Sequence, residues 1–222
     1  MQTIRRTASV PALDQYRALA QDATGDDIIS TLNYALTLEH LENTFYATGL
    51  STFVSADIEA LGFLPGVFDF IGEIGAHEAA HVETLTSVIS DLGGEPVEQG
   101  EYDFGDALTD PSVFIATAAA LENTGVSAYT GAAQYLIEND DLLTAALTIH
   151  GVEARHAAYL NILNGENPFP ESFEPVLTPA EVLEIAGPFV VSGEVVVPSA
   201  SEEDAEDESE DESEDDEGTP DA

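Results

Sequence analysis

Four long segments of the chain carry apolar side chains at every third or fourth position, which is the period of an amphipathic α-helix. They span residues 26–48, 67–92, 111–139 and 140–164. Aspartates that can cap a helix lie at the start of the first segment (Asp26, Asp27), just before the third (Asp110) and at the start of the fourth (Asp140 or Asp141), and glycines follow the first and second segments. These signals predict an all-α fold in which residues 26–164 form a four-helix bundle.

The regions outside the bundle have a different composition. Residues 1–25 are expected to form an arm with a short helix, and residues 165–198 a proline-rich segment that packs on the bundle. Within that segment we expect a short helix at 179–186 and an extended strip at 195–197. Residues 199–222 are mostly acidic or small, so we expect a disordered acidic tail.

A glutamate interrupts each apolar stripe, at a position where the period calls for a core residue. The four are Glu39, Glu78, Glu122 and Glu153, and histidines follow the second and fourth by three positions, at His81 and His156. Residues three apart lie on one helix face, so each Glu-x-x-His pair can present an oxygen and a nitrogen to one point. All four glutamates lie near mid-helix, so we expect them to meet at one height in the bundle.

Burying so many carboxylates requires compensating charge, because each unpaired one would cost several kcal/mol. Two divalent metal ions would balance four glutamates. The chain has no cysteine, so any metal must be held by nitrogen and oxygen atoms. The alternative is a degenerate bundle in which the glutamates and histidines pair with one another.

The charge balance narrows the choice of partners. The chain has 44 acidic residues, four arginines and no lysine, which gives a formal net charge of −40. Molar salt screens the repulsion among so many acidic side chains, so the net charge indicates a protein of a high-salt cytoplasm. An ordinary acidic protein with a charged tail is the alternative. Nucleic acids and anionic membranes are excluded as partners, because little positive charge is present to neutralise phosphates. No apolar run is long enough for a membrane span or an export signal, so we expect a cytoplasmic protein.

The sequence around these residues resembles the ferritin-like di-iron carboxylate bundles, in which Glu, Glu-x-x-His, Glu and Glu-x-x-His follow one another on four helices. LEHLENTFYATG, HEAAHVETL, LENTGVSAYTG and VEARHAAYL are similar in particular to the ferritin-like-domain family that includes desiccation-related proteins and is common in halophilic archaea. The resemblance covers about residues 26–164. It implies a ferritin-like four-helix bundle with two iron ions as cofactors.

The first helix contains two candidate ligands. Aligning its LENT with the LENT of the third helix selects Glu42. Glu39, however, lies seven residues before Tyr46. The third helix repeats this spacing between Glu122 and Tyr129, which favours Glu39. We therefore predict Glu39 as the ligand and Glu42 as a neighbour of the ligands or an alternative ligand. The two tyrosines are expected either to hydrogen-bond ligand carboxylates or only to pack.

The remaining histidines and Arg155 are assigned outside the ligand set. His40 and His77 are adjacent to ligands in sequence but turned about 100° away from them, so we predict that both lie on the surface. His150 is expected in the core or beside the ligands. Arg155 is expected to face solvent, the alternative being an ion pair with a glutamate of the site.

Several functions fit such a centre. The first is a di-iron protein that reacts with dioxygen or peroxide, as a ferroxidase or peroxide scavenger in oxidative or desiccation stress, because carboxylate-rich ligand sets suit iron and manganese. A manganese protein with catalase-like activity is the close alternative. A non-catalytic structural or stress-protection bundle is another, and a cage for iron storage is less favoured. A homodimer is the default oligomer.

Overall fold

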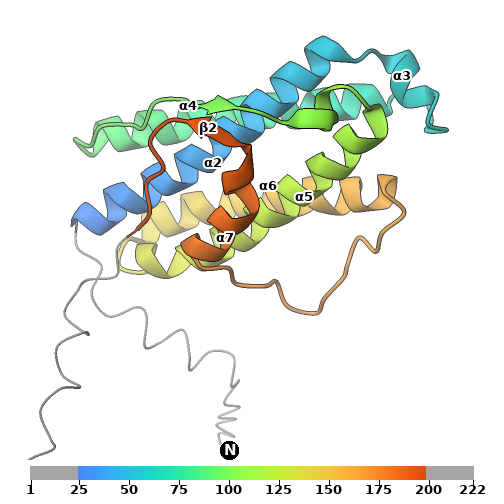
Figure 1. Ribbon diagram of the computed structural model, residues 1–222. Helices are drawn as coiled ribbons and strands as arrows, with labels where there is room; N and C mark the ends of the chain where they lie inside the picture. The colour runs from blue at the N-terminus through green and yellow to red at the C-terminus, as the bar shows by residue number, and fades with distance from the viewer. Residues whose placement is uncertain (1–24, 199–222) are drawn as a thin grey trace, which may run out of the picture.

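The structure is a computed structural model that describes residues 25–198 (Figure 1), so the predicted N-terminal helix and the acidic tail lie outside the described residues. The long helices are α2 (Gly25–Thr52), α4 (Val67–Asp91), α5 (Pro111–Ala132) and α6 (Asp140–Leu163). The shorter elements are α3 (Ser55–Glu59), α7 (Pro179–Ala186), the 3₁₀ turns η1 (Gly105–Leu108), η2 (Ala133–Leu136) and η3 (Gly187–Phe189), and strands β1 (Glu101–Tyr102) and β2 (Val190–Ser192). The predicted all-α fold is confirmed. Within residues 25–198 no helix combines the length and apolarity that crossing a membrane requires.

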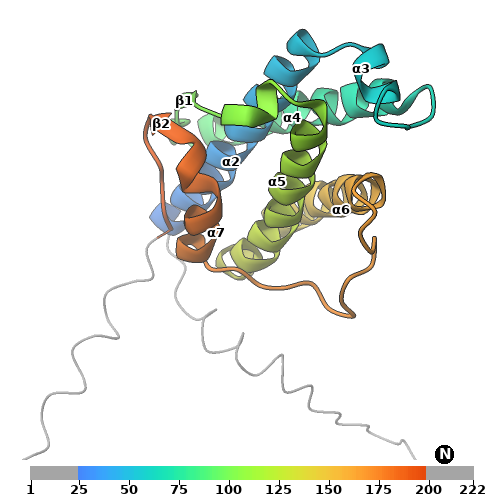
Figure 2. The ribbon, with the colours of Figure 1, turned by 45° about the vertical axis from the view of Figure 1, so that its right-hand side comes forward.

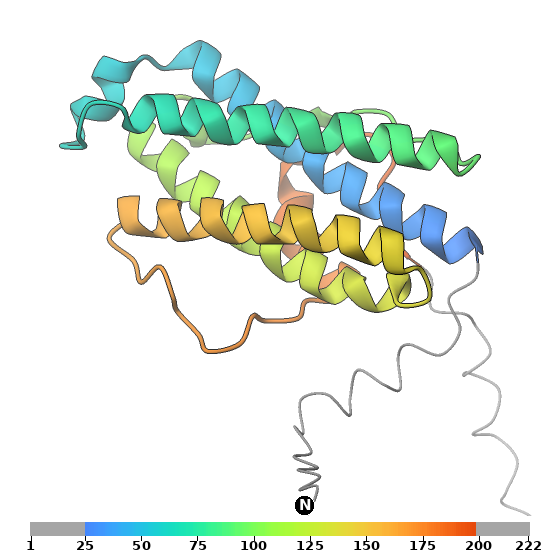
Figure 3. The same cartoon turned by 180° about the vertical axis from the view of Figure 1, so that it is seen from behind.

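The four long helices pack as two pairs, α2 with α4 and α5 with α6. Helix α7 packs against α5, on the side away from α6 (Figure 2). Viewed from behind, α4 and α6 form the near face of the bundle, with α2 and α5 behind them (Figure 3). The helices within each pair run in opposite directions, and the connection from α4 to α5 travels back along the bundle. This is the arrangement of a four-helix bundle with one long crossover.

Two apolar clusters fill the interior and leave a layer between them. One cluster surrounds the rings of Phe45 and Phe114, whose centroids are 4.8 Å apart. The other surrounds Leu36 and Ile89. Each long helix contributes side chains to both clusters, so the middle of every helix faces the layer between them. This layer receives the glutamates that interrupt the apolar stripes.

The first long helix is longer than predicted, because Gly49 is not its end. The helix continues to Thr52. A Cβ atom at Gly49 would overlap the ring of Phe114 on α5. Glycine at this position therefore allows two helices to approach closely instead of ending one of them.

The third long helix begins as predicted and ends earlier. The Asp110 side chain accepts a hydrogen bond from the Ser112 backbone N–H at 2.8 Å, which caps the helix. The helix ends at Ala132, not near residue 139, because the chain tightens into the 3₁₀ turn η2. Asn139 then caps α6 by accepting from a backbone N–H in its first turn.

The segment after the bundle folds back onto the crossover. Val182 of α7 is fully buried in the cluster around Phe45 and Phe114. Strand β2 pairs antiparallel with β1, with Tyr102 opposite Val190, and the Asp103 N–H donates to the Phe189 carbonyl at 2.9 Å. The extended pairing thus occurs at residues 190–192, and no paired strand forms at the predicted strip 195–197.

Candidate metal centre

The six residues predicted as ligands lie together in the middle layer of the bundle. Helix α2 supplies Glu39, α4 supplies Glu78 and His81, α5 supplies Glu122, and α6 supplies Glu153 and His156. All four carboxylates are 0 % exposed. The two apolar clusters enclose them from both ends of the bundle, so water cannot solvate their charge.

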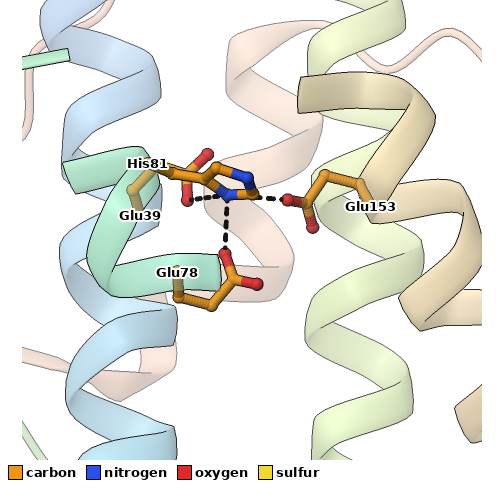
Figure 4. A group of neighbouring side chains, drawn as sticks. All are labelled: Glu39, Glu78, His81 and Glu153. Atoms are coloured by element: carbon orange, nitrogen blue, oxygen red, sulfur yellow. Dashed lines mark hydrogen bonds and ion pairs between the residues drawn. The ribbon is translucent and has the colours of Figure 1, made fainter. Parts of the chain in front are cut away.

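These side chains form two overlapping groups of four. The first is Glu39, Glu78, His81 and Glu153 (Figure 4), and the second is Glu78, Glu122, Glu153 and His156. In each group, one nitrogen or oxygen atom from every residue lies within 4.8 Å of the others. Glu78 and Glu153 belong to both groups. The arrangement therefore offers two neighbouring positions for a cation, with two carboxylates shared between them.

The imidazole of His81 lies at the centre of the first group. Its Nδ1 atom is 3.2 Å from Glu39 Oε2, 3.0 Å from Glu78 Oε2 and 3.0 Å from Glu153 Oε1. Burial lowers the pKa of His81, but the three carboxylates outweigh burial and raise the pKa to about 12. The protonated ring thus supplies positive charge where the carboxylates converge.

His156 has the same role in the second group. Its Nδ1 atom is 3.1 Å from Glu78 Oε1, 3.1 Å from Glu122 Oε2 and 3.8 Å from Glu153 Oε2. Burial again lowers the pKa, and the carboxylates, Glu122 foremost, outweigh it and raise the pKa to about 11. Each group therefore pairs one imidazole with three carboxylates.

Burial affects the glutamates unequally. It raises the pKa of Glu39 to about 8 and, together with the charge of Glu153, raises that of Glu122 well above its usual value. Burial also opposes ionisation of Glu153, but contacts with His156 and His81 outweigh it and hold the pKa down to about 2. Glu153 is therefore charged at neutral pH, whereas Glu39 is mainly protonated.

Three buried oxygen atoms in the centre have no hydrogen-bond donor among residues 25–198: Glu78 Oε1, Glu153 Oε1 and Glu153 Oε2. Imidazole nitrogens lie 3.0 Å from Glu153 Oε1 and 3.1 Å from Glu78 Oε1, but not in hydrogen-bond geometry. Buried polar atoms normally have a partner, and leaving them without one is costly. All three belong to the shared carboxylates, where two cations would need oxygen ligands, so the residues present fit a pair of metal ions.

Two tyrosines hold the carboxylates that belong to one group only. The Tyr129 hydroxyl donates to Glu39 Oε1 at 2.5 Å, and the Tyr46 hydroxyl donates to Glu122 Oε1 at 2.6 Å. The other oxygen of each carboxylate faces a histidine of its group. Burial raises the pKa of both tyrosines well above 10.0, so both hydroxyls keep the proton that they donate.

Glu42 belongs to neither group of four, although it is 4 % exposed and lies near the centre. Burial, followed by the charge of Glu153, raises its pKa well above the usual value, which favours the neutral form of the acid. Gly125 on α5 makes room for it, because a Cβ atom there would lie 3.1 Å from Glu42 Oε1. Of the two candidates on the first helix, the structure thus brings Glu39 into a group and places Glu42 beside it.

A family model described as a ferritin-like domain matches residues 27–166 of the chain. The chain belongs to the ferritin-like domain family. The match spans the four long helices, so all six residues of the two groups lie within the ferritin-like domain. No curated protein matches the chain.

The prediction that His40 lies on the surface of the ferritin-like domain is wrong. The side chain is buried, and its Nε2 atom lies 3.2 Å from the Val97 carbonyl oxygen. The crossover covers this side of α2, where Asn33 also accepts a hydrogen bond from the Val97 N–H at 2.7 Å. A helical period cannot reveal that a connection covers the outer face.

His77 is exposed, as predicted, but it also contacts the centre. Its Nδ1 atom lies 2.9 Å from Nε2 of His156, and the two rings are nearly parallel, at 10°. Sequence spacing could not find this contact, because the two histidines lie on different helices. His150 is half-buried against the Thr130 hydroxyl and belongs to neither group, and Arg155 is exposed.

Proposed function

We propose that this ferritin-like protein binds two iron ions and oxidises them with dioxygen or peroxide. The observation that carries the proposal is that Glu78 and Glu153 belong to both ligand groups, so that two cations would share them. One further glutamate and one histidine would complete each position: Glu39 with His81, and Glu122 with His156. Bound iron would supply the electrons that reduce dioxygen or peroxide.

The donor set supports iron, with manganese as the alternative. Four carboxylates and two imidazoles are available, and the chain has no cysteine. Ligand sets of this kind suit iron and manganese, whereas thiolate-rich sets suit zinc and iron–sulfur clusters. Two divalent cations would also balance the four carboxylates, which removes the main cost of burying them.

The tyrosines would fix the geometry of the centre. The Tyr129 hydroxyl holds one oxygen of Glu39, and the Tyr46 hydroxyl holds one oxygen of Glu122. The other oxygen of each carboxylate faces the histidine of its group, where a metal would bind. Groups that hold a ligand in this way orient it and tune the metal that it binds.

Glu42 would supply a proton. Reduction of dioxygen or peroxide consumes protons, and burial favours the neutral, protonated form of Glu42. Its Oε1 atom occupies the space left by Gly125, where Glu153 Oε2 is also a neighbour. Glu42 could therefore pass a proton toward the shared carboxylates without forming part of either ligand group.

The test combines metal analysis with a single reaction. Purified protein should bind two ions per chain after anaerobic loading with Fe(II), and exposure to oxygen should then produce the absorbance of Fe(III). The Glu78→Gln variant should bind no pair of ions and should not accelerate oxidation, whereas Glu42→Gln should still bind two. Wild-type protein that binds no iron, or that oxidises it no faster than the variant does, would refute the proposal.

The alternatives give different results in the same experiment. A manganese protein with catalase-like activity would release oxygen from peroxide after loading with Mn(II) and would not do so with iron. A non-catalytic bundle would bind metal and gain thermal stability but would show no turnover of oxygen or peroxide.

We also propose that the protein acts against oxidative or desiccation stress in a high-salt cytoplasm. The strong excess of acidic residues supports this setting, because molar salt screens their mutual repulsion. The thermal unfolding temperature should therefore rise as KCl is raised to molar concentrations. An unfolding temperature that does not change with KCl would argue against a high-salt cytoplasm as the setting.

A further inference from the structure

A cleft lies between side chains of α4 and α6. These two helices are the nearest to the viewer in Figure 3. The volume of the cleft is about 280 Å³, and its lining includes Phe70, Glu73 and His77 of α4 and Arg155, His156 and Tyr159 of α6. Binding sites for small molecules begin at roughly 300 Å³, so the cleft suits a ligand with a single ring. His156 is also a member of the second ligand group, so the cleft adjoins the candidate metal centre.

Arg155 brings to the cleft the one arginine or lysine side chain of residues 25–198. The same part of the chain contains 28 acidic residues. Its side chain is exposed, and no carboxylate of residues 25–198 forms an ion pair with it. An anion near this face would therefore be attracted to Arg155 and repelled by the many carboxylates elsewhere on the surface.

The other walls of the cleft favour a flat ring with a hydroxyl group. Phe70 is 51 % exposed, and its ring meets that of Tyr159 edge to face at 5.9 Å. Exposed aromatic rings provide flat apolar surfaces on which another ring can pack. Glu73 lines the same cleft and can accept a hydrogen bond from a ligand hydroxyl, while its charge would keep the anionic end of the ligand at Arg155.

His77 connects the cleft to the centre. Its ring lines the cleft, and its Nδ1 atom lies 2.9 Å from Nε2 of His156, whose Nδ1 atom faces the carboxylates Glu78 and Glu122. A ligand that packs on His77 would thus be separated from the ligand groups by two imidazole rings in contact.

We propose that this cleft binds a small aromatic anion of the hydroquinone type, which acts as the reductant of the metal centre. The role as reductant rests on the proposed function, whereas the binding does not. Conversion of a hydroquinone to a quinone releases two electrons and two protons. Two electrons return two trivalent ions to the divalent state, and the protons can leave through the open cleft.

The binding test uses the full chain loaded with zinc, which undergoes no redox reaction, and nuclear magnetic resonance to follow the His77 ring and the ligand. The probe is 2,5-dihydroxybenzoate, and its uncharged analogue 1,4-dihydroxybenzene is the matched ligand. Arg155→Gln should weaken binding of the acid by about tenfold or more, because a charge-assisted hydrogen bond is lost. Arg155→Lys should retain most of the binding. Ser90→Glu should not affect it, although it makes the same change in net charge about 20 Å along α4.

The outcomes separate this inference from the proposed function. The inference is overturned if the acid does not shift the His77 signals, or if wild type and Arg155→Gln bind it equally well. Binding that depends on Arg155 in a chain that does not oxidise iron would support the cleft and refute the proposed function. In iron-loaded, oxidised protein, Arg155→Gln should slow reduction of the iron by 2,5-dihydroxybenzoate about tenfold and should leave reduction by 1,4-dihydroxybenzene unchanged. Equal slowing with both compounds would overturn the role of the aromatic anion as reductant.

Discussion

Replacement of Glu78 by glutamine is expected to remove both metal ions, because its carboxylate belongs to both ligand groups. Glutamine has the same shape but no charge to offer a cation. Glu39→Gln and Glu122→Gln should each remove only one ion, since each of these residues belongs to a single group. Glu42→Gln is the matched control: Glu42 belongs to neither group and burial favours its neutral form, so the variant should still bind two ions.

The magnitude follows from mass action. A metal present at a hundred times its dissociation constant stabilises the folded state by about 2.7 kcal/mol per ion, so two independent ions contribute about 5 kcal/mol. For a domain of this size, 1 kcal/mol corresponds to a change of about 2–4 °C in unfolding temperature. Saturating metal should therefore raise the unfolding temperature by roughly 10–20 °C in wild type and about half as much in Glu39→Gln. Glu78→Gln should show almost no increase.

The assay is thermal unfolding followed by circular dichroism, with and without a chelator, together with the metal content of each variant. Two results would refute the reasoning. One is a Glu42→Gln variant that loses both ions, because Glu42 would then be a ligand. The other is a Glu39→Gln variant that loses as much metal as Glu78→Gln, because the two positions would then not be separable.

Three further predictions concern single features of the bundle. Tyr46→Phe should destabilise the protein by about 1–3 kcal/mol in urea unfolding, because Glu122 Oε1 loses its donor. Tyr34→Phe should cost little, because the buried Tyr34 hydroxyl has no hydrogen-bond partner in the described part of the chain, and equal losses in the two variants would contradict this. Gly49→Ala should destabilise the folded protein by about 1–3 kcal/mol, because the new Cβ atom would overlap the Phe114 ring on α5. Gly72→Ala should stabilise the folded protein by about 0.5–1 kcal/mol, because a Cβ atom there meets no other atom within contact distance. The pKa values of His81, His156 and Glu39 are raised to about 12, about 11 and about 8, so these groups carry protons at neutral pH that metal binding must displace. Metal affinity should therefore rise with pH and fall on acidification, and an indicator dye should detect proton release on loading; binding without release would be inconsistent with these pKa values.

The sequence predicted the middle layer of the bundle well, because burial and helical period are linked. A glutamate within an apolar stripe must point into the core, and four of them at mid-helix must meet. The structure places all four carboxylates and both Glu-x-x-His histidines in two overlapping groups. The choice between Glu39 and Glu42 was harder, because both are buried, and the spacing to Tyr46 rather than the burial distinguished them.

Contacts between distant segments could not be predicted in the same way. His40 is buried because the crossover lies over α2, and His77 reaches His156 across the gap between two helices. Gly49 was misread as a helix end because a glycine that permits close packing and a glycine that ends a helix look the same in sequence. In each case the deciding partner is more than fifty residues away along the chain.

Each ligand group takes three residues from one half of the chain and one from the other. The first group joins three residues of α2 and α4 to Glu153 of α6, and the second joins three residues of α5 and α6 to Glu78 of α4. Neither helical pair can complete a cation position alone. A pair of metal ions would hold the two halves of the chain together. The lifetime of the folded chain in a cell would then depend on the supply of the metal.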